Sequence, residues 1–223
     1  MSKNILIVGA SGLVGGEILK NLKTTNNDLI LLSRKKLLCE NSINQIVIDF
    51  ENIDSLDASL KVDEIYIAIG QKLSLSELVY IKKNNRKSFV NVDYNYIKKV
   101  AEFAKKCGAS SIGLISAIGA NTKSFNTYLK VKGDVEQEIK LVGYKKIIIA
   151  HPSHLLGERA GEDIPINVKV FEQITNLFGL LMIGPLQKFR NVEAKKVAKA
   201  IIYKMDSVER GIHYIDYKYF KNF

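Results

Sequence analysis

Three glycines spaced three residues apart near the N-terminus constrain the fold of this chain more than any other feature. Apolar residues from Ile5 to Val8 lead directly into the sequence GASGLVG at residues 9–15. A run of four apolar residues has the length of a strand that is buried on both faces of a parallel sheet. From Leu13 to Leu22 the apolar residues recur at helical spacing. This stretch therefore predicts a strand, a tight turn and a helix.

The glycines stand where dinucleotide-binding folds require them. At Gly9, Gly12 and Gly15 the backbone can turn tightly, approach a pyrophosphate and pack a helix against a strand. The pyrophosphate would bind to the free N–H groups at the start of the helix. A strand-to-helix turn with no ligand is the alternative. The alternation of strands and helices that follows favours dinucleotide binding.

The rest of the chain continues this alternation. Apolar runs predict further strands at 28–32, 45–48, 64–69, 111–116 and 146–150, and helical spacing predicts helices at 55–60, 88–107 and 124–141. The alternation predicts an α/β fold: a Rossmann-like, doubly wound, mostly parallel sheet with helices on both faces.

The character of the sequence changes after Ala150. All three prolines lie beyond this point, which indicates loops and short helices, with helices expected at 167–178 and 192–205 and a short strand near 213–215. We expect residues 1–150 to form an NAD(P)-binding domain. Residues 151–223 would form a small C-terminal substrate lobe, integrated with that domain, over the carboxyl ends of the strands.

Composition narrows the class of protein. Of 223 residues, 47% are hydrophobic and 25% charged, which is ordinary for a soluble globular chain. Cys39 and Cys107 have no metal-like spacing, no apolar run reaches the ~18 residues of a membrane span, and the first strand starts too early for a signal peptide. These observations predict a cytoplasmic protein with no metal site and no membrane contact.

The net charge of +10 comes mostly from lysine pairs scattered over many segments. Solvated helix faces account for such pairs better than a nucleic-acid interface, which needs one basic block interleaved with aromatic residues. We therefore expect a small-molecule substrate and no nucleic acid. The chain is expected to be a monomer or a homodimer.

The end of the second predicted strand indicates which dinucleotide would bind. NAD-binding sites place an acidic residue there to bond the ribose 2′-hydroxyl, whereas an arginine accommodates a 2′-phosphate. Here the strand ends in Ser33, Arg34, Lys35 and Lys36, with no acid. NADP(H) is therefore favoured over NAD(H). The alternative is a solvated basic turn.

Tyr128 and Lys132 are candidates for the chemistry. They lie four residues apart on a predicted helix, so both side chains share one face. A lysine ammonium favours the phenolate, so we expect Lys132 to lower the pKa of Tyr128. Ser116, at the end of the preceding strand, would bond a substrate carbonyl oxygen. The Tyr-x-x-x-Lys spacing occurs four times in the chain, and the serine-ended strand singles out this pair.

The chain resembles the atypical short-chain dehydrogenase/reductases, and among them the Tat-interacting-protein-like oxidoreductases. The resemblance covers nearly the whole sequence. The matching stretches are GASGLVG at 9–15, LLSR at 31–34, FVNVDYNYIKKVAEFAKKCGA at 89–109, LISAIGA at 114–120, YLKVKGDVE at 128–136 and GPLQKFRNVEAKKVAKAI at 184–201.

This resemblance implies roles for particular residues. The phosphates would contact Gly9, Ser11, Gly12, Leu13 and Val14, and the 2′-phosphate would contact Arg34. The adenine would lie beside Asp49 and Phe50, and the adenosine ribose would lie beside Ala68, Ile69 and Gly70. Tyr128 would be the catalytic acid and base. Lys132 would bind the nicotinamide ribose and tune Tyr128.

Three positions depart from the family pattern. Ala117 stands where similar proteins have a second serine, His151 precedes Pro152 where they often have arginine, and Asp93 occupies a helix position that holds a structural asparagine in many relatives. The sequence thus predicts an NADPH-dependent reductase of a small carbonyl compound. An NADP(H)-sensing regulatory protein with little catalysis is the main alternative. A sugar-nucleotide epimerase or dehydratase is less favoured, because the C-terminal lobe is small.

Overall fold

The core of the protein is a sheet of seven parallel strands. The structure is a computed structural model in which residues 2–38, 43–157 and 184–223 are described. In spatial order the strands are β3 (Asn44–Val47), β2 (Asp28–Ser33), β1 (Asn4–Val8), β4 (Glu64–Ile67), β5 (Ser111–Ile115), β6 (Lys146–Ala150) and β9 (Gly211–Ile215). The predicted Rossmann-like α/β fold is confirmed. The predicted strands read as apolar runs because helices cover both faces of a parallel sheet.

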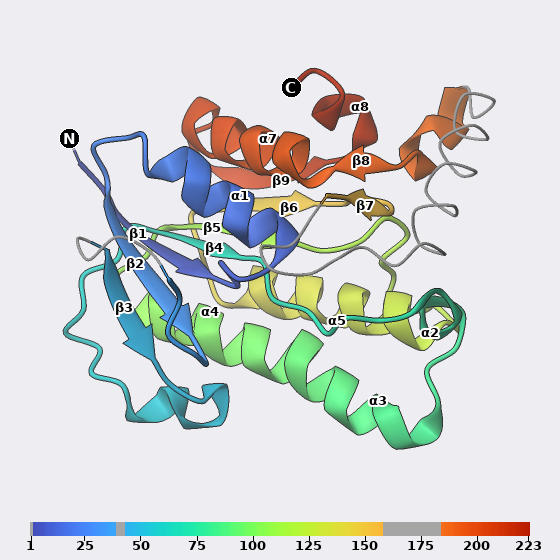
Figure 1. Cartoon of the computed structure of the whole chain (residues 1–223), viewed down its shortest axis with the longest axis horizontal. Helices are drawn as coiled ribbons and strands as arrows, with labels where there is room; N and C mark the ends of the chain where they lie inside the picture. The colour runs from blue at the N-terminus through green and yellow to red at the C-terminus, as the bar shows by residue number, and fades with distance from the viewer. Residues whose placement is uncertain (1, 39–42, 158–183) are drawn as a thin grey trace.

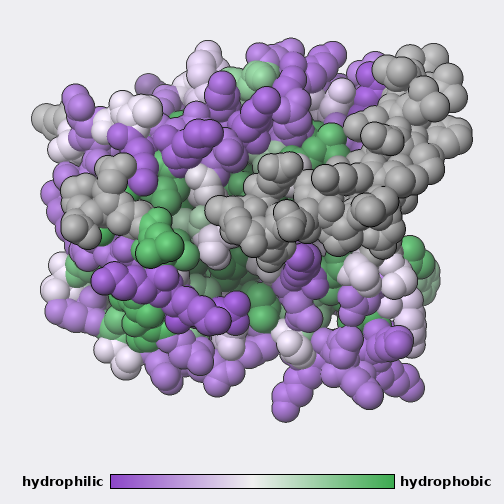
Figure 2. All heavy atoms as spheres, in the orientation of Figure 1, coloured by the Kyte–Doolittle hydropathy of each residue, from purple (hydrophilic) through white to green (hydrophobic). Residues whose placement is uncertain are grey.

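Helices cover both faces of the sheet (Figure 1). One face carries α1 (Leu13–Leu22), α7 (Ala194–Ser207) and the short α8 (Tyr217–Phe220), and the other carries α3 (Lys83–Val90), the π-helical segment η2 (Asn91–Tyr96), α4 (Ile97–Lys106) and α5 (Thr127–Leu141). Two large hydrophobic clusters result, one on each side of the sheet. Figure 2 shows hydrophilic side chains over the outer surfaces of α1, α7 and α3, as expected for helices whose apolar sides face a sheet.

The order of the strands creates a topological switch beside β1. The chain runs outward from β1 to β2 and β3, then returns to the other side of β1 and continues through β4, β5, β6 and β9. Connections therefore leave β1 and β4 in opposite directions. In open α/β sheets, ligands bind at the carboxyl ends of the strands beside such a reversal.

Two short helices differ from the sequence prediction. The helix predicted at 55–60 is wrong: a 3-10 helix, η1, spans Phe50–Ser55 and ends where that helix was expected to begin. Its start is fixed by Asp49, whose side chain accepts a hydrogen bond from Glu51 N at 3.1 Å. A further helix, α2 (Leu75–Val79), was not predicted. It is only five residues long and is held by a capping box between Ser74 and Glu77.

The described part of the C-terminal region adds to the same sheet. β9 pairs with β6, α7 packs against α1, and the short strands β7 (Leu155–Leu156) and β8 (Val192–Glu193) form a parallel pair beside the 3-10 helix η3 (Gly184–Phe189). The helix predicted at 167–178 lies outside the described residues. Within the described ranges, no helix has the length and apolar character needed to cross a bilayer.

Candidate active site

The turn after β1 has the backbone form that the glycine spacing predicts. Gly9 has a φ of 93°, a conformation that favours glycine, and Gly12 N donates to Gly9 O at 2.9 Å. A Cβ atom on Gly15 would lie only 2.1 Å from Gly9 O, so the first turn of α1 rests directly on this loop. Gly12 caps α1 without a side-chain hydrogen bond. No side chain of the N-cap residue therefore occupies the N–H groups at the start of α1.

A cleft of about 400 Å³ opens at the carboxyl ends of β1, β2 and β4. It joins the glycine turn to the ends of the two neighbouring strands, as the topological switch predicts. Most of the predicted cofactor residues line it, namely Gly9, Ser11, Gly12, Arg34, Phe50, Ala68, Ile69 and Gly70. The sequence analysis missed the other lining residues, Ser33, Gln71, Lys72, Ser88, Val92 and Tyr96.

Three of the predicted cofactor residues lie outside this cleft, and so do the predicted catalytic residues Tyr128, Lys132 and Ser116. Leu13 lines a separate pocket of about 250 Å³ next to β7 and α7, and Val14 is buried in the hydrophobic cluster under α1. Asp49 is exposed and uses its side chain to cap η1. The structure therefore gives Val14 and Asp49 packing and capping contacts.

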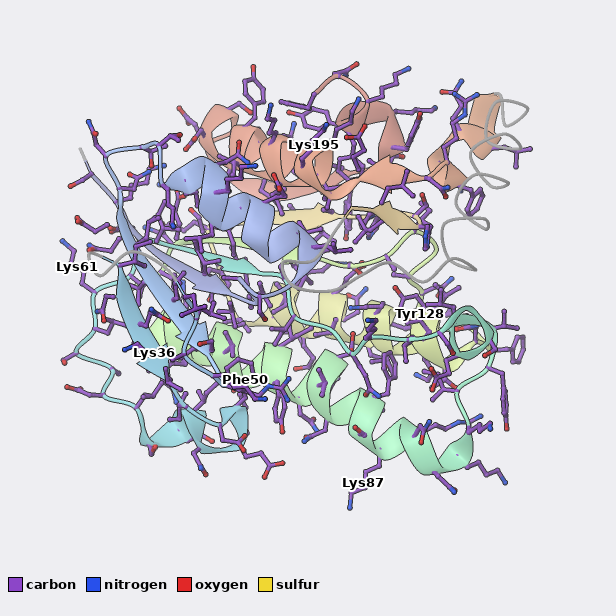
Figure 3. The ribbon with its side chains drawn as sticks, viewed as in Figure 1. Lys36, Phe50, Lys61, Lys87, Tyr128 and Lys195 are labelled. Atoms are coloured by element: carbon purple, nitrogen blue, oxygen red, sulfur yellow. The ribbon has the colours of Figure 1, made fainter. Side chains whose placement is uncertain are left out.

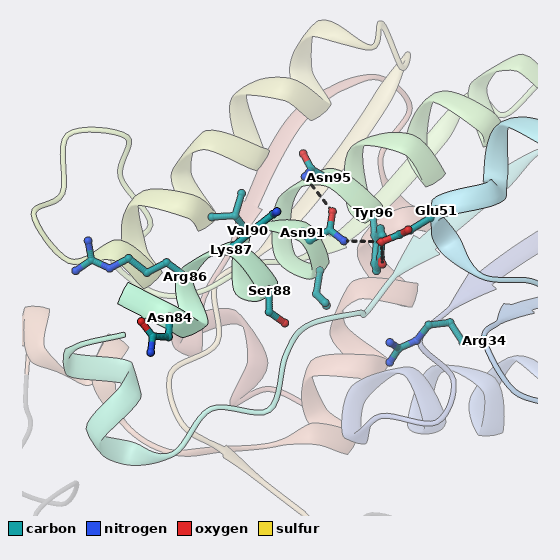
Figure 4. A pocket seen from close by; sticks show the side chains of 11 residues that line it. Arg34, Glu51, Asn84, Arg86, Lys87, Ser88, Val90, Asn91, Asn95 and Tyr96 are labelled. Atoms are coloured by element: carbon teal, nitrogen blue, oxygen red, sulfur yellow. Dashed lines mark hydrogen bonds between the residues drawn. The ribbon is translucent and has the colours of Figure 1, made fainter. Parts of the chain in front are cut away.

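Aromatic residues form one wall of the cleft. The rings of Phe50 and Tyr96 meet edge to face, with centroids 5.6 Å apart and an interplanar angle of 84°. Tyr96 Oη and Asn91 Nδ2 both donate to Glu51 Oε1 at 3.2 Å (Figure 4). Burial and the nearby Glu51 carboxylate raise the pKa of Tyr96. This wall is an aromatic surface with the Glu51 carboxylate at its edge.

Arg34 stands between this cleft and a second, wider cavity. The second cavity has a volume of about 940 Å³ and shares Arg34, Ser88, Val92 and Tyr96 with the first. Figure 4 shows the Arg34 side chain extending toward the opening, across from the helix that carries Asn84, Lys87 and Ser88. An exposed guanidinium at the end of β2 is placed to meet an anionic group at the mouth of the cleft.

Tyr128 and Lys132 lie on α5, as predicted, but the environment of Tyr128 is more apolar than expected. Figure 3 shows Tyr128 at the end of α5 nearest α2. Its ring packs near Phe89, with centroids 6.0 Å apart, and joins a small hydrophobic cluster. Burial raises the pKa of Tyr128, Lys132 lowers it, and Asp93 raises it, so the pKa lies above its usual value. Lys132 thus lowers the pKa of Tyr128, as predicted, but burial outweighs the lysine, so the expected net decrease in this pKa is wrong.

Lys132 has a direct partner that the sequence analysis did not assign. Its Nζ lies 2.8 Å from Asp93 Oδ1, and both side chains are buried. Burial lowers the pKa of Lys132, but Asp93 and Tyr128 raise it by more, so the ammonium form is favoured. The two partners are 39 positions apart in the sequence, on η2 and α5, so no local pattern links them.

Ser116 belongs to a different group of contacts. Its hydroxyl donates to Glu136 Oε1, and His151 Nε2 lies 2.8 Å from the same oxygen. Glu136 lies on α5 one turn after Lys132, and it is buried like Ser116. A hydroxyl has one proton to donate. The proton of Ser116 is directed to Glu136 in this arrangement.

Gly70 connects the cleft to the Tyr128–Lys132 pair. It lines the cleft, and a Cβ atom on it would lie 3.2 Å from Asp93 Oδ1 and 3.8 Å from Lys132 Nζ. The backbone after β4 therefore separates the cleft from the buried ion pair by a single residue. A ligand that extended from the glycine turn past Gly70 would come close to Lys132.

Comparisons with curated proteins point to one group. The chain is 32% identical to the protein HTATIP2 of Rattus norvegicus over 165 residues, which cover 71% of this chain and 65% of that protein. It is 31% identical over 176 residues to the protein FMP52 of Lodderomyces elongisporus, covering 71% and 69%. FMP52 of Candida albicans matches at 28% over 214 residues, covering 93% and 88%. The matched region thus spans a little under two thirds of the rat protein. No family model matches the chain.

Solved structures share the fold at low sequence identity. MoeE5 in complex with UDP-glucose and NAD superposes with a TM-score of 0.69 at 12% identity, covering 97% of this chain and 79% of that one. A short-chain dehydrogenase family protein from Francisella tularensis has a TM-score of 0.67 at 17% identity, covering 98% and 99%. These likenesses confirm the fold.

The predicted location needs correction. The FMP52 proteins of Lodderomyces elongisporus, Candida albicans and Kluyveromyces lactis are named mitochondrial. This contradicts the cytoplasmic location expected from the cysteines and the position of the first strand. Neither feature distinguishes the cytoplasm from another compartment in which thiols stay reduced.

Proposed function

The chain belongs to the Tat-interacting-protein-like, NAD(P)-binding family of atypical short-chain dehydrogenase/reductases, which includes HTATIP2 and FMP52, and we propose that it is an NADP(H)-dependent oxidoreductase that reduces a small carbonyl compound. The observation that carries this proposal is the position of Gly70. This residue lines the cleft that starts at the glycine turn, and it also lies against the Lys132 ammonium. A dinucleotide in the cleft would therefore reach the residues suited to proton transfer.

The described residues divide the binding of the cofactor between them. The glycine turn and the start of α1 would hold the pyrophosphate, since their N–H groups attract anions. The Phe50 side of the cleft would take the adenine, and Ala68, Ile69 and Gly70 the adenosine ribose. When bound, the nicotinamide cofactor supplies a hydride.

Proton transfer would be the task of Tyr128. A carbonyl that accepts a hydride also needs a proton on its oxygen, and a tyrosine hydroxyl within hydrogen-bond reach supplies it. Because burial raises the pKa of Tyr128, the hydroxyl keeps its proton at neutral pH and remains a donor. Lys132 would orient the nicotinamide ribose and polarise the tyrosine. This assignment gives Tyr128 the protonated state that the reductive direction of the reaction requires.

The preference for NADP(H) over NAD(H) rests on Arg34. Its exposed guanidinium at the end of β2 suits a 2′-phosphate. No acidic residue stands beside it in the sequence to accept a hydrogen bond from the ribose 2′-hydroxyl of NAD(H). Lys35 follows it and is equally exposed, but it does not line the cleft. The two neighbouring cations therefore form a matched pair for a test.

Calorimetric titration with NADPH and with NADH tests the cofactor assignment. Arg34→Ala is expected to weaken NADPH binding by roughly tenfold or more, the loss of one charge-assisted hydrogen bond, and to leave NADH binding unchanged. Lys35→Ala removes the same charge and should change NADPH binding by less than about threefold through screened electrostatics. Equal losses in both variants would show a general charge effect, and no binding of either nucleotide would refute the proposal.

A regulatory protein that senses NADP(H) is the second candidate function. It is favoured by one observation: the only serine at the end of β5 donates its proton to Glu136, and Ala117 follows it. A sensor would bind NADPH without consuming it when offered a panel of aldehydes and ketones. Consumption that depends on Tyr128 would exclude this function.

A further inference from the structure

Asp93 uses both of its carboxylate oxygens to join two parts of the site. Oδ1 lies 2.8 Å from Lys132 Nζ on α5, and Oδ2 accepts a hydrogen bond from Gln71 N, just after β4, at 2.7 Å. Asp93 is 1% exposed and Lys132 is 5% exposed. Gln71 lines the cleft. The carboxylate therefore fixes the lysine relative to the wall of the cleft.

The local structure of the helix places Asp93 in this position. It lies in the π-helical segment η2, between α3 and α4. A π-helical turn holds an additional residue and shifts side chains relative to a regular helix, and such turns are frequent at functional sites. Within η2, Asp93 and Tyr96 are buried while Asn95 is exposed. Tyr96 lines the cleft and Asp93 lies behind it.

The charged groups around Tyr128 and Lys132 come from several elements. Asp93 reaches them from η2, and Glu136 lies one turn further along α5. Glu136 is in turn bonded to Ser116, after β5, and lies 2.8 Å from His151, after β6. On the α3 side, Tyr128 meets the uncharged ring of Phe89. Among the described residues, the Lys132 ammonium thus faces two carboxylates: Asp93, which contacts it at 2.8 Å, and Glu136, one turn further along α5.

We propose that Asp93 is a positioning residue of this site: its carboxylate holds the Lys132 ammonium beside Tyr128, offsets that positive charge, and so biases the pair toward donating a proton. The proposal rests on the proposed function, because proton donation is the role that carbonyl reduction requires. An uncharged side chain at this position would leave the ammonium free to stabilise the phenolate. The site would then favour accepting a proton.

The direction of the effect follows from electrostatics. A negative charge near a hydroxyl or an ammonium disfavours the loss of its proton. The Asp93 carboxylate raises the pKa of Tyr128 and also that of Lys132. Replacing Asp93 by asparagine removes the charge and keeps one oxygen that accepts from Lys132, while the amide nitrogen cannot accept from Gln71 N, so that hydrogen bond is lost. Glu136 still favours the ammonium form of Lys132, and an ammonium that Asp93 no longer offsets lowers the pH at which the Tyr128 hydroxyl ionises.

Ultraviolet titration of tyrosinate tests this without any substrate. The chain has ten tyrosines, so the signal of Tyr128 is obtained by subtracting the titration of a Tyr128→Phe variant, once in the natural background and once with Asp93→Asn. We expect Tyr128 to ionise above about pH 10 in the natural protein. In the Asp93→Asn background we expect its midpoint to fall by roughly one pH unit.

Asp134→Asn is the matched control. It is the same aspartate-to-asparagine change, and it removes the charge of an aspartate that pairs with a lysine on α5, since Asp134 Oδ2 lies 3.0 Å from Lys130 Nζ. Unlike the Asp93–Lys132 pair, this ion pair is partly exposed. Its Tyr128 midpoint should equal that of the natural protein. A midpoint in Asp93→Asn that stays the same or rises would overturn the proposal.

Two further outcomes keep the test decisive. If Asp93→Asn fails to fold, the titration of Tyr128 in the natural protein still tests the proposal. A Tyr128 midpoint near pH 8 or below would mean that Asp93 does not offset the charge of Lys132, and would overturn the proposal. A natural protein that shows no NADPH-dependent turnover would refute the proposed function and leave this titration unaffected. The two failures can therefore be told apart.

Discussion

At the scale of single residues, four-residue spacing identified Tyr128 and Lys132 but not their environment. The spacing occurs four times in the chain, and the strand ending before the helix distinguished this pair. Their burial and the contact with Asp93 depend on how η2 packs against α5, which no local pattern encodes. For that reason the sequence predicted the lowering effect of Lys132 on the pKa of Tyr128 but not the larger, raising effect of burial.

Ser116→Ala tests whether the hydrogen bond from Ser116 to Glu136 keeps this serine from taking part in catalysis. Because its hydroxyl donates to Glu136, we expect kcat for NADPH-dependent carbonyl reduction to fall by less than about tenfold, below the roughly 10²-fold that a general acid supplies. Ser207→Ala, an exposed serine at the end of α7, should leave kcat unchanged. A loss of about 10²-fold or more in Ser116→Ala alone would return the serine to the catalytic set.

At the scale of elements, predictions succeeded where a helix or strand buries a long apolar face. The strand, turn and helix from β1 to α1 agree with the sequence prediction, and so do the strands β5 and β6. The failures are short elements. The start of η1 is set by the Asp49 side chain, and α2 depends on the capping box of Ser74 and Glu77 rather than on apolar periodicity. The capping box is visible in the sequence and was the available signal.

The contact of α1 with the glycine turn leads to a test at this scale. Gly15→Ala would place a Cβ atom 2.1 Å from Gly9 O, so the helix or the turn must move. We expect a loss of about 1–3 kcal/mol in the free energy of unfolding, as in overpacked cores, together with loss of NADPH binding. Thermal or urea unfolding and calorimetry measure the two effects.

Gly16→Ala is the control on the same helix. Its Cβ atom would lie 3.3 Å from Ala10 O, a tight contact but not a clash, and helix propensity gains up to about 1 kcal/mol from the change. This variant should stay close to the natural protein in stability and in NADPH binding. Equal behaviour of the two variants would contradict the close contact between α1 and the turn.

At the scale of the whole molecule, the doubly wound parallel sheet could be predicted without its strand order, and the organisation of the C-terminal region only in part. Alternating apolar runs predicted a doubly wound parallel sheet, and the cleft lies beside the reversal next to β1. The described C-terminal residues supply β9 and α7 to this sheet, so the division at residue 150 stays a prediction. Composition could not specify the cellular compartment, because the cysteines and the net charge do not act as a targeting signal.

The measurement that tests the account most directly is NADPH consumption with a panel of aldehydes and ketones, in the natural protein, in Tyr128→Phe and in Tyr94→Phe. Tyr94 precedes Lys98 by the same four residues, but it lies on η2, and Lys98 pairs with Glu138 rather than with Asp93. We expect turnover that Tyr128→Phe lowers by roughly 10²-fold or more and that Tyr94→Phe preserves. Full turnover in Tyr128→Phe, or tight NADPH binding with no turnover in the natural protein, would contradict it.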